Sequence, residues 1–121
     1  MDRGKKLTTR NLSREIKTAV IASQAKKGET ICVLDLREIS SFTEFFLITH
    51  GNSSRQNLAI CEGIEQALKK VNRKPLGVEG TAHGEWILMD YGSFVVHIFS
   101  RKAREYYSLE KLWGDAPKLS L

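Results

Sequence analysis

The segment Gly51-Asn52-Ser53-Ser54 is the first place in this chain where residue type and spacing could support chemistry. It separates an apolar run from an amphipathic one, so it would lie where a strand ends and a helix begins. The free N–H groups and the dipole at the start of a helix can bind a phosphate group. Neither a G-x-G-x-x-G nor a G-x-x-x-x-G-K-S/T motif occurs. A capped turn is therefore the favoured interpretation of this segment.

Paired carboxylates are missing from the place where phosphoryl transfer would need them. Nucleotidyltransferases combine a similar strand-Gly-Ser-helix segment with two acids spaced two residues apart on a neighbouring strand. Side-chain alternation puts both acids on one face, where they share Mg²⁺ ions. In this chain no Asp or Glu is followed two positions later by another, and Asp35 and Asp90 each stand alone at the end of an apolar run. The sequence therefore offers no ligand set for two-metal chemistry.

Histidine, cysteine and serine also lack the spacing of known catalytic or metal sites. His50, His83 and His97 form no H-x-H or H-E-x-x-H pattern, and no G-x-S-x-G motif occurs. Cys32 and Cys61 form no C-x-x-C pair and lie in apolar stretches, which predicts two reduced thiols in the core. We therefore expect no catalytic residues, no metal and no cofactor, and the protein is predicted not to be an enzyme.

Aromatic residues are concentrated at the other end of the chain. The first 41 residues contain none, and acids are interleaved with those of the last third. An exposed aromatic surface rimmed by carboxylates is typical of a protein-binding hot spot and favours a basic partner. For any single ring, packing in the core is the alternative. The aromatic residues are Trp86, Tyr91, Phe94, Phe99, Tyr106, Tyr107 and Trp113, and the acids are Glu85, Asp90, Glu105, Glu110 and Asp115.

Charge is unevenly placed along the 121 residues. The formal net charge is +5, yet residues 1–27 hold eight Lys or Arg and only two acids. This basic segment is either a solvated face or a surface with weak attraction to RNA. No apolar run approaches the ~20 residues of a membrane helix, and no hydrophobic signal core follows the basic start. We therefore expect a cytoplasmic protein with no membrane partner.

Hydrophobic periodicity predicts a single α/β domain with the order α-β-β-α-β-β-β-α. Asn11 is the expected N-cap of the first helix and Gly28 its expected C′ residue. We expect a mixed five-stranded sheet with helices packed on it at residues 11–117, preceded by a basic flexible arm at residues 1–10 and followed by a tail at residues 118–121. The predicted helices are 12–27, 55–71, 101–107 and 109–113, and the predicted strands are 30–36, 45–49, 76–79, 86–90 and 94–99.

Several segments together resemble the ribosomal silencing factor family, whose members are also called Iojap-related proteins. The resemblance covers residues 12–117. It implies a fold related to nucleotidyltransferases but without their catalytic acids. It also implies binding to the fourteenth protein of the large ribosomal subunit. The bound factor would sterically prevent the small subunit from joining, which lowers translation when nutrients are short. The matching segments are DLREISSFT (35–43), GNSSRQ (51–56), GEWILMDYG (84–92), VHIF (96–99) and REYYSLEKLWGD (104–115).

We expect the partner-binding residues on the predicted hairpin and the segment that follows it. Trp86 is the expected hydrophobic anchor, and Asp90 and Glu85 are expected to pair with Lys or Arg of the ribosomal protein. The basic first helix is expected to contact rRNA weakly, and two copies could pair through the apolar hairpin off the ribosome. An enzyme using Gly51–Ser54 with Asp35 or Asp90, and a free RNA-binding module, are the alternatives. The full expected set is Glu85, Trp86, Leu88, Asp90, Tyr91, His97, Phe99, Tyr107, Leu109 and Trp113.

Overall fold

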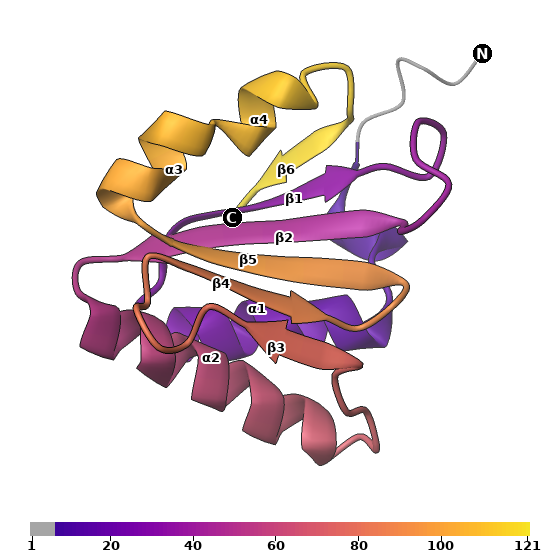
Figure 1. Ribbon diagram of the computed structural model, residues 1–121. Coiled ribbons are helices and arrows are strands. Elements are labelled where there is room, and N and C mark those ends of the chain that lie inside the picture. Colours follow the sequence, from indigo (N-terminus) through magenta and orange to yellow (C-terminus); the bar gives the residue numbers. More distant parts are fainter. Residues whose placement is uncertain (1–6) are drawn as a thin grey trace.

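The computed structural model describes residues 7–121, which form a six-stranded mixed sheet with helices on both faces (Figure 1). The strand order is β3-β4-β5-β2-β1-β6; β2 and β5 pair in parallel, and the other four pairs are antiparallel. The predicted mixed α/β class is therefore confirmed. Most of the predicted arm lies outside the described residues, but Leu7 is buried in the core and Thr9–Asn11 forms a short 3-10 helix. Packing therefore begins before residue 11.

Helices α1 (Arg14–Ala25) and α2 (Ser54–Lys69) cover one face of the sheet. Each begins after a serine that accepts a hydrogen bond from a backbone N–H: Ser13 from Ile16, and Ser53 from Gln56. The predicted N-cap Asn11 is wrong, because Ser13 performs that role. Within residues 7–121, no helix has both the length and the apolar content needed to cross a bilayer. The residues of these helices that are buried include Ile16, Ala19 and Val20 of α1 and Ile60, Ile64 and Leu68 of α2.

Gly28 follows α1 but does not close it with a left-handed conformation. Lys27 takes that conformation, with φ of 64°. A Cβ at Gly28 would lie 2.8 Å from Oγ1 of Thr49 and 3.2 Å from the Ser23 carbonyl oxygen. Glycine is therefore needed here because the chain passes close to β2, and this close approach brings α1 onto the sheet.

Side-chain alternation along the strands creates two separate cores. One side of each central strand packs under α1 and α2, with Val33, Leu47 and Val96 among its buried residues. The other side faces the opposite direction and buries Leu34 and Ile48, among others. The strands are β1 (Glu29–Asp35), β2 (Phe45–Gly51), β3 (Gly77–Glu79), β4 (Trp86–Asp90) and β5 (Phe94–Ser100).

The second face carries two short helices, α3 (Arg101–Tyr107) and α4 (Leu109–Leu112), before the chain returns to the sheet. The sequence predicts five strands, and the structure has a sixth, β6 (Lys118–Ser120). The predicted tail is therefore part of the sheet, with Leu119 opposite Val33 of β1. Only its pairing with β1 makes this segment a strand.

Both cysteines are free and buried, as predicted. Burial, followed by the neighbouring Glu110 carboxylate, raises the pKa of Cys32 to about 12. Burial also raises the pKa of Cys61 to about 11, with Glu65 and Glu62 contributing. Both thiols are therefore protonated at neutral pH and act as small apolar side chains.

One buried arginine joins α3 and α4 to the sheet. Arg104 of α3 is only 8% exposed, and its Nη2 donates to Oε2 of Glu110 on α4 at 2.6 Å. Its Nη1 lies 3.0 Å from Nδ1 of His50 on β2 and donates to the Glu29 carbonyl oxygen of β1 at 3.3 Å. Because these groups surround the guanidinium, its position fixes where both short helices lie on the sheet.

The pKa values in this cluster follow from the same geometry. Burial alone would raise the pKa of Glu110, but the hydrogen bond and the charge of Arg104 outweigh it, and the pKa is lowered overall. Burial and the neighbouring guanidinium lower the pKa of His50, so this imidazole is neutral at pH 7 and can accept from Arg104.

Removing the cation from this cluster should destabilise the fold. Arg104→Leu leaves Glu110 without its partner, and we expect the free energy of unfolding to fall by about 3 kcal/mol. Arg101→Leu is the matched control, because Arg101 lies on the same helix, faces solvent and makes only a 3.5 Å ion pair with Glu29. We expect it to cost less than about 0.5 kcal/mol. Urea denaturation measures both values, and equal losses would contradict the role of Arg104.

Candidate docking surface

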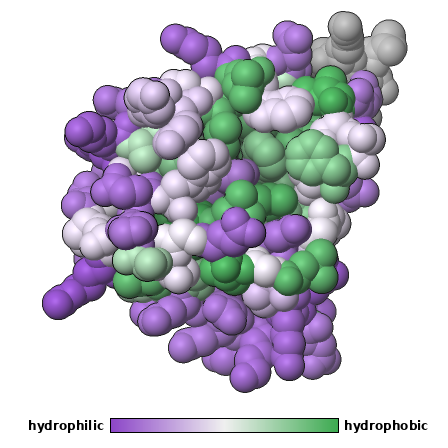
Figure 2. Space-filling model, in the orientation of Figure 1, coloured by the Kyte–Doolittle hydropathy of each residue, from purple (hydrophilic) through white to green (hydrophobic). Residues whose placement is uncertain are grey.

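The short helices leave part of the second face of the sheet uncovered. α3 contacts β2 and β5, and α4 lies toward the β1–β6 side, so that neither helix extends over β3 (Figure 1). Trp86, Leu88 and Asp90 of β4 alternate onto this uncovered side, and each is half-buried. Figure 2 shows apolar side chains gathered across the middle of this surface, bordered by hydrophilic ones. We call the surface the open face; it comprises Glu79, Trp86, Leu88, Asp90, Tyr107 and Trp113.

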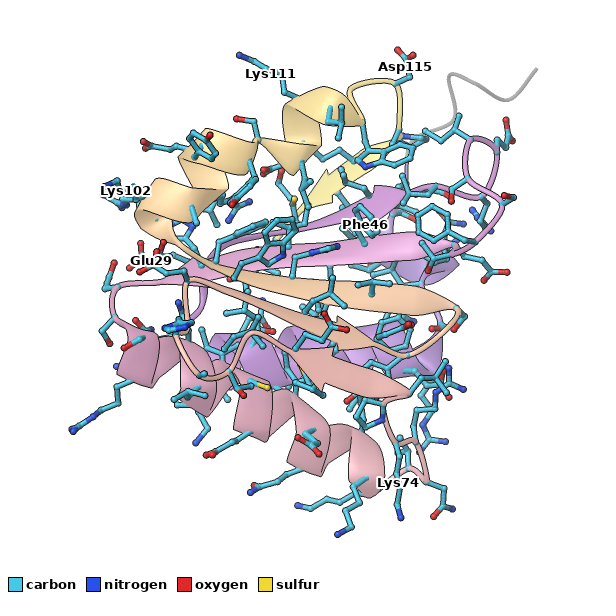
Figure 3. The ribbon with its side chains drawn as sticks, in the orientation of Figure 1. Glu29, Phe46, Lys74, Lys102, Lys111 and Asp115 are labelled. Carbon is cyan, nitrogen blue, oxygen red and sulfur yellow. The ribbon has the colours of Figure 1, made fainter. Side chains whose placement is uncertain are left out.

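Contacts between rings hold the aromatic side chains of the open face in place. Trp86 lies against Tyr107 of α3, with ring centroids 4.5 Å apart. Phe46 of β2, labelled in Figure 3, packs edge-on against His97 at 4.4 Å and against Trp113 at 6.0 Å. Each such pair contributes about 0.5–1.5 kcal/mol beyond the buried area. The rings are therefore ordered before any partner arrives, which lowers the entropy cost of binding.

His97 supports the indole of Trp86 from below. Nε1 of Trp86 donates a hydrogen bond of 3.0 Å to Nδ1 of His97. Because the indole N–H can only donate, Nδ1 must be the accepting nitrogen, and the proton of the neutral ring lies on Nε2. His97 is only 4% exposed, and this burial lowers its pKa to about 4. At neutral pH the imidazole is therefore uncharged and can orient the indole.

Acidic residues border the open face. Glu79 lies opposite Leu88 in the β3–β4 register, and Asp90 is the last residue of β4. Asp90 also binds locally, where it accepts from the Gly92 N–H at 2.8 Å. Glu85 directly precedes β4 and accepts from the Ser100 hydroxyl at 2.7 Å, on the side of the sheet opposite Trp86. Strands β2 to β5 contain no Lys or Arg. An apolar centre with this rim is complementary to a basic protein surface.

The structure places the ten expected partner-binding residues in three different situations. Five reach the open face, three are buried beneath it, and two lie elsewhere. Tyr91 is misplaced, because it lies on the opposite side of the sheet, 1% exposed and stacked on Phe94 with centroids 4.9 Å apart. Partner binding by the other nine stays a prediction. The surface residues are Trp86, Leu88, Asp90, Tyr107 and Trp113, and the supporting ones are His97, Phe99 and Leu109. Glu85 pairs with Ser100 on the side opposite Trp86.

Two residues are absent from the predicted set: Phe46, buried beneath the open face, and Glu79, on its rim. Phe46 lies in a strand that is buried on both sides, and such a continuous apolar run gives no alternation from which its direction could be read. Glu79 joins the rim only because β3 pairs with β4, and β3 is three residues long. The repeated acid-aromatic pattern around Glu85 therefore indicates only part of the surface.

The segment Gly51–Ser54 is a capped turn. Oγ of Ser53 accepts from the Gln56 N–H at 3.0 Å, and Oε1 of Gln56 accepts from the Asn52 N–H at 2.7 Å. Asn52 in turn donates to Glu29 at 2.7 Å. These hydrogen bonds occupy the N–H groups of residues 52 and 56, which could otherwise donate to a phosphate. Among residues 7–121, no group of three His, Cys, Asp or Glu side chains is placed to hold a metal ion.

Because His97 is buried, we predict that the free energy of unfolding falls as the pH is lowered. In the unfolded chain its imidazole takes up a proton near pH 6.5, whereas in the folded chain it does so only near pH 4. Between these values the unfolded state binds more protons, so the free energy of unfolding should fall as pH decreases, by up to about 3 kcal/mol from this group. His97→Gln should therefore flatten the slope between pH 6.5 and 4, measured by urea denaturation across this range.

His50, whose pKa is also lowered, will keep part of the slope in the His97→Gln variant. The comparison therefore needs the difference between the parent and variant curves. Parallel curves over this window would show that His97 does not stay neutral in the folded chain. NMR titration of the imidazole gives an independent value.

Comparison with known proteins identifies the family. The model of the family described as "Ribosomal silencing factor during starvation" matches residues 9–121. A ribosomal silencing factor of Bacillus subtilis is 42% identical over 106 residues, covering 88% of this chain and 90% of that protein. A mouse protein named "Mitochondrial assembly of ribosomal large subunit protein 1" is 30% identical over 102 residues, covering 82% of this chain and 45% of that protein.

A solved structure extends the similarity to three dimensions. A crystal structure of a Chromobacterium violaceum protein superposes with a TM-score of 0.81 at 35% sequence identity, covering 83% of each chain. The family model reaches residue 121 and so includes β6. From the matched length and the shared fold, the chain belongs to the ribosomal silencing factor family.

Proposed function

We propose that this protein silences ribosomes in the cytoplasm by docking its open face on the fourteenth protein of the large ribosomal subunit. While bound, it occupies space that the small subunit needs, and translation falls when nutrients are short. The observation that carries this proposal is the uncovered half of the sheet, where ordered aromatic rings are surrounded by acids. The names of its relatives, which refer to ribosomal silencing and to large-subunit assembly, support the ribosome as the target.

Occlusion needs a firm contact but no catalytic group. A standard protein interface buries about 800 Å² on each partner, which a domain of 13.7 kDa can supply. A surface covered by this domain cannot be occupied by a second partner at the same time. The effect on translation then depends on how long the complex lasts, and a few buried anchors dominate that lifetime.

The two parts of the open face contribute differently. Trp86 and Leu88 are partly buried against the second core and would bury the rest of their surface on a partner. The rim acids would attract Lys or Arg and steer the approach of a basic ribosomal protein. We therefore expect the apolar centre to set the dissociation rate and the acids to set the association rate and its salt dependence.

The alternatives make different predictions. A nucleotidyltransferase-like enzyme would show Mg²⁺-dependent nucleotide binding by calorimetry. A free RNA-binding module would bind naked RNA as tightly as it binds large subunits. Pairing of two copies through the apolar surface, in the absence of ribosomes, stays a prediction that sedimentation equilibrium can test.

Reversing one rim charge should weaken docking. Glu79→Lys places a cation beside Leu88, and we expect at least a tenfold loss of affinity for large subunits, about 1.4 kcal/mol. Glu62→Lys makes the same charge change on the exposed side of α2, on the opposite face, and should bind like the parent. Co-sedimentation with purified large subunits at low salt measures both. Equal affinities for the two variants would place the contact elsewhere.

Removing the anchor together with a second acid should abolish the biological effect. In Trp86→Ala with Asp90→Lys, the loss of a buried aromatic anchor alone is expected to cost at least about 2 kcal/mol of binding. Subunit joining, followed by light scattering, should then proceed as if no factor were present. Circular dichroism confirms that the variant is folded. A folded variant that still blocks joining would overturn the assignment of the open face.

A further inference from the structure

A second charged surface lies on the other layer of the molecule, where α1 begins and α2 ends. The two helices run antiparallel, because Lys26 just after α1 lies against Gly63 in the middle of α2, and Glu15 at the start of α1 pairs with Arg73 beyond α2 at 3.9 Å. Residues 9–15 and 69–74 therefore meet at one corner. Figure 3 shows Lys74 at this corner, directed away from the sheet. We call the following set the basic corner: Arg10, Arg14, Lys69, Lys70, Arg73 and Lys74.

This corner holds the whole charge excess of the protein. Residues 9–15 and 69–74 contain six Lys or Arg and one acid, an excess of five that equals the formal net charge of the chain. Arg73 is bound locally, since it pairs with Glu15 and donates to the Tyr91 carbonyl oxygen. Among the described residues, no ion pair within 4 Å involves the other five cations. Their charge is therefore available to an external ligand.

Fold stability does not account for all of these cations. Lys69 and Lys70 complement the negative end of the α2 dipole. Arg14, however, is the first residue of α1, at the positive end of its dipole, and Arg10 lies in the short 3-10 helix that precedes that end. Placing cations there, beside other cations, works against stability. Such local conflicts are expected where a surface is shaped for binding.

The composition of the corner indicates which polyanion it fits. It contains no aromatic residue, so it offers no platform on which the bases of single-stranded RNA could stack. Long flexible cations without stacking groups suit the phosphate backbone of a duplex, which is recognised by charge and shape. The rRNA of a large subunit would present such a backbone close to the protein on which the open face docks.

We propose that the basic corner binds the phosphate backbone of double-stranded RNA while the open face holds a protein partner. The proposal rests on the proposed function for the source of the RNA, but the contact itself is independent of it. It places the RNA contact at the corner where α1 begins and α2 ends, whereas the sequence predicts that contact along the first helix. The cations of that segment do not share one face: Arg14 lies at the basic corner, whereas Lys26 and Lys27 lie at the opposite end of α1.

A salt titration with a short RNA duplex tests the proposal, using fluorescence anisotropy of the labelled duplex. The parent should bind at low salt, with an affinity that falls steeply as salt rises. Replacing Lys69, Lys70 and Lys74 together by Gln should weaken binding at least tenfold and reduce the slope of log affinity against log salt by about 1 for each phosphate that is no longer neutralised. The control replaces Lys102, Lys111 and Lys118 by Gln, an equal charge change on α3, α4 and β6, and should bind like the parent.

Three results would overturn the proposal: no binding of the parent to the duplex at low salt, equally weakened binding in both triple variants, or tighter binding to anionic phosphatidylserine vesicles than to the duplex. Its failure can be separated from that of the docking model. If the duplex does not bind but Glu79→Lys still weakens large-subunit binding, only the RNA contact is wrong. If the triple variant no longer binds the duplex while Glu79→Lys binds subunits like the parent, the basic corner is retained and the open face is wrong.

Discussion

The ion pair between Arg104 and Glu110 determines which part of the sheet is available for binding. The helices that it holds have only seven and four residues, too few to cover six strands. Because the guanidinium also bonds to β1 and approaches His50 of β2, both helices are fixed on that side of the sheet. Trp86 and Leu88 on β4 consequently stay partly exposed. A buried ion pair is not in itself strong evidence of stability, but it can specify position, and position is what matters here.

The limits of helices and strands are predicted well where local sequence signals agree. They are predicted poorly where only pairing with another strand makes a segment a strand. The limits of β4 are correct because the run Trp86–Asp90 is strongly apolar and bounded by a turn, and the limits of α3 are correct because Ser100 caps it. β6 could not be recognised, since only its pairing with β1 makes it a strand. Tyr91 belongs to the predicted hairpin and is therefore expected on the same surface as Asp90. Alternation instead sends its ring under the helices.

Clustering of aromatic residues in a sequence does not by itself distinguish a core from a binding surface. Here buried and exposed rings lie together: Phe99 and His97 are buried, and Trp86 and Tyr107 lie on them with their outer edges in solvent. The buried residues make the exposed ones effective, because the hydrogen bond from Trp86 to His97 and the ring contacts restrict the indole to one orientation. A flexible tryptophan would lose rotamer entropy on binding, whereas this one has already lost it on folding.

Negative and positive charges are concentrated on different parts of the molecule. The open face has acids and no Lys or Arg on its strands, whereas the basic corner on the helical layer carries a charge excess equal to that of the whole chain. A basic protein embedded in RNA offers the reverse arrangement, with a cationic patch beside a dense field of phosphates. Only one orientation of this domain satisfies both, because turning it over would set acids against phosphates and cations against cations. Like charges opposed in this way are strongly unfavourable. In the proposed docking, charge asymmetry would therefore select the orientation of the domain, and a factor acting by occupying space would need a fixed orientation more than high affinity.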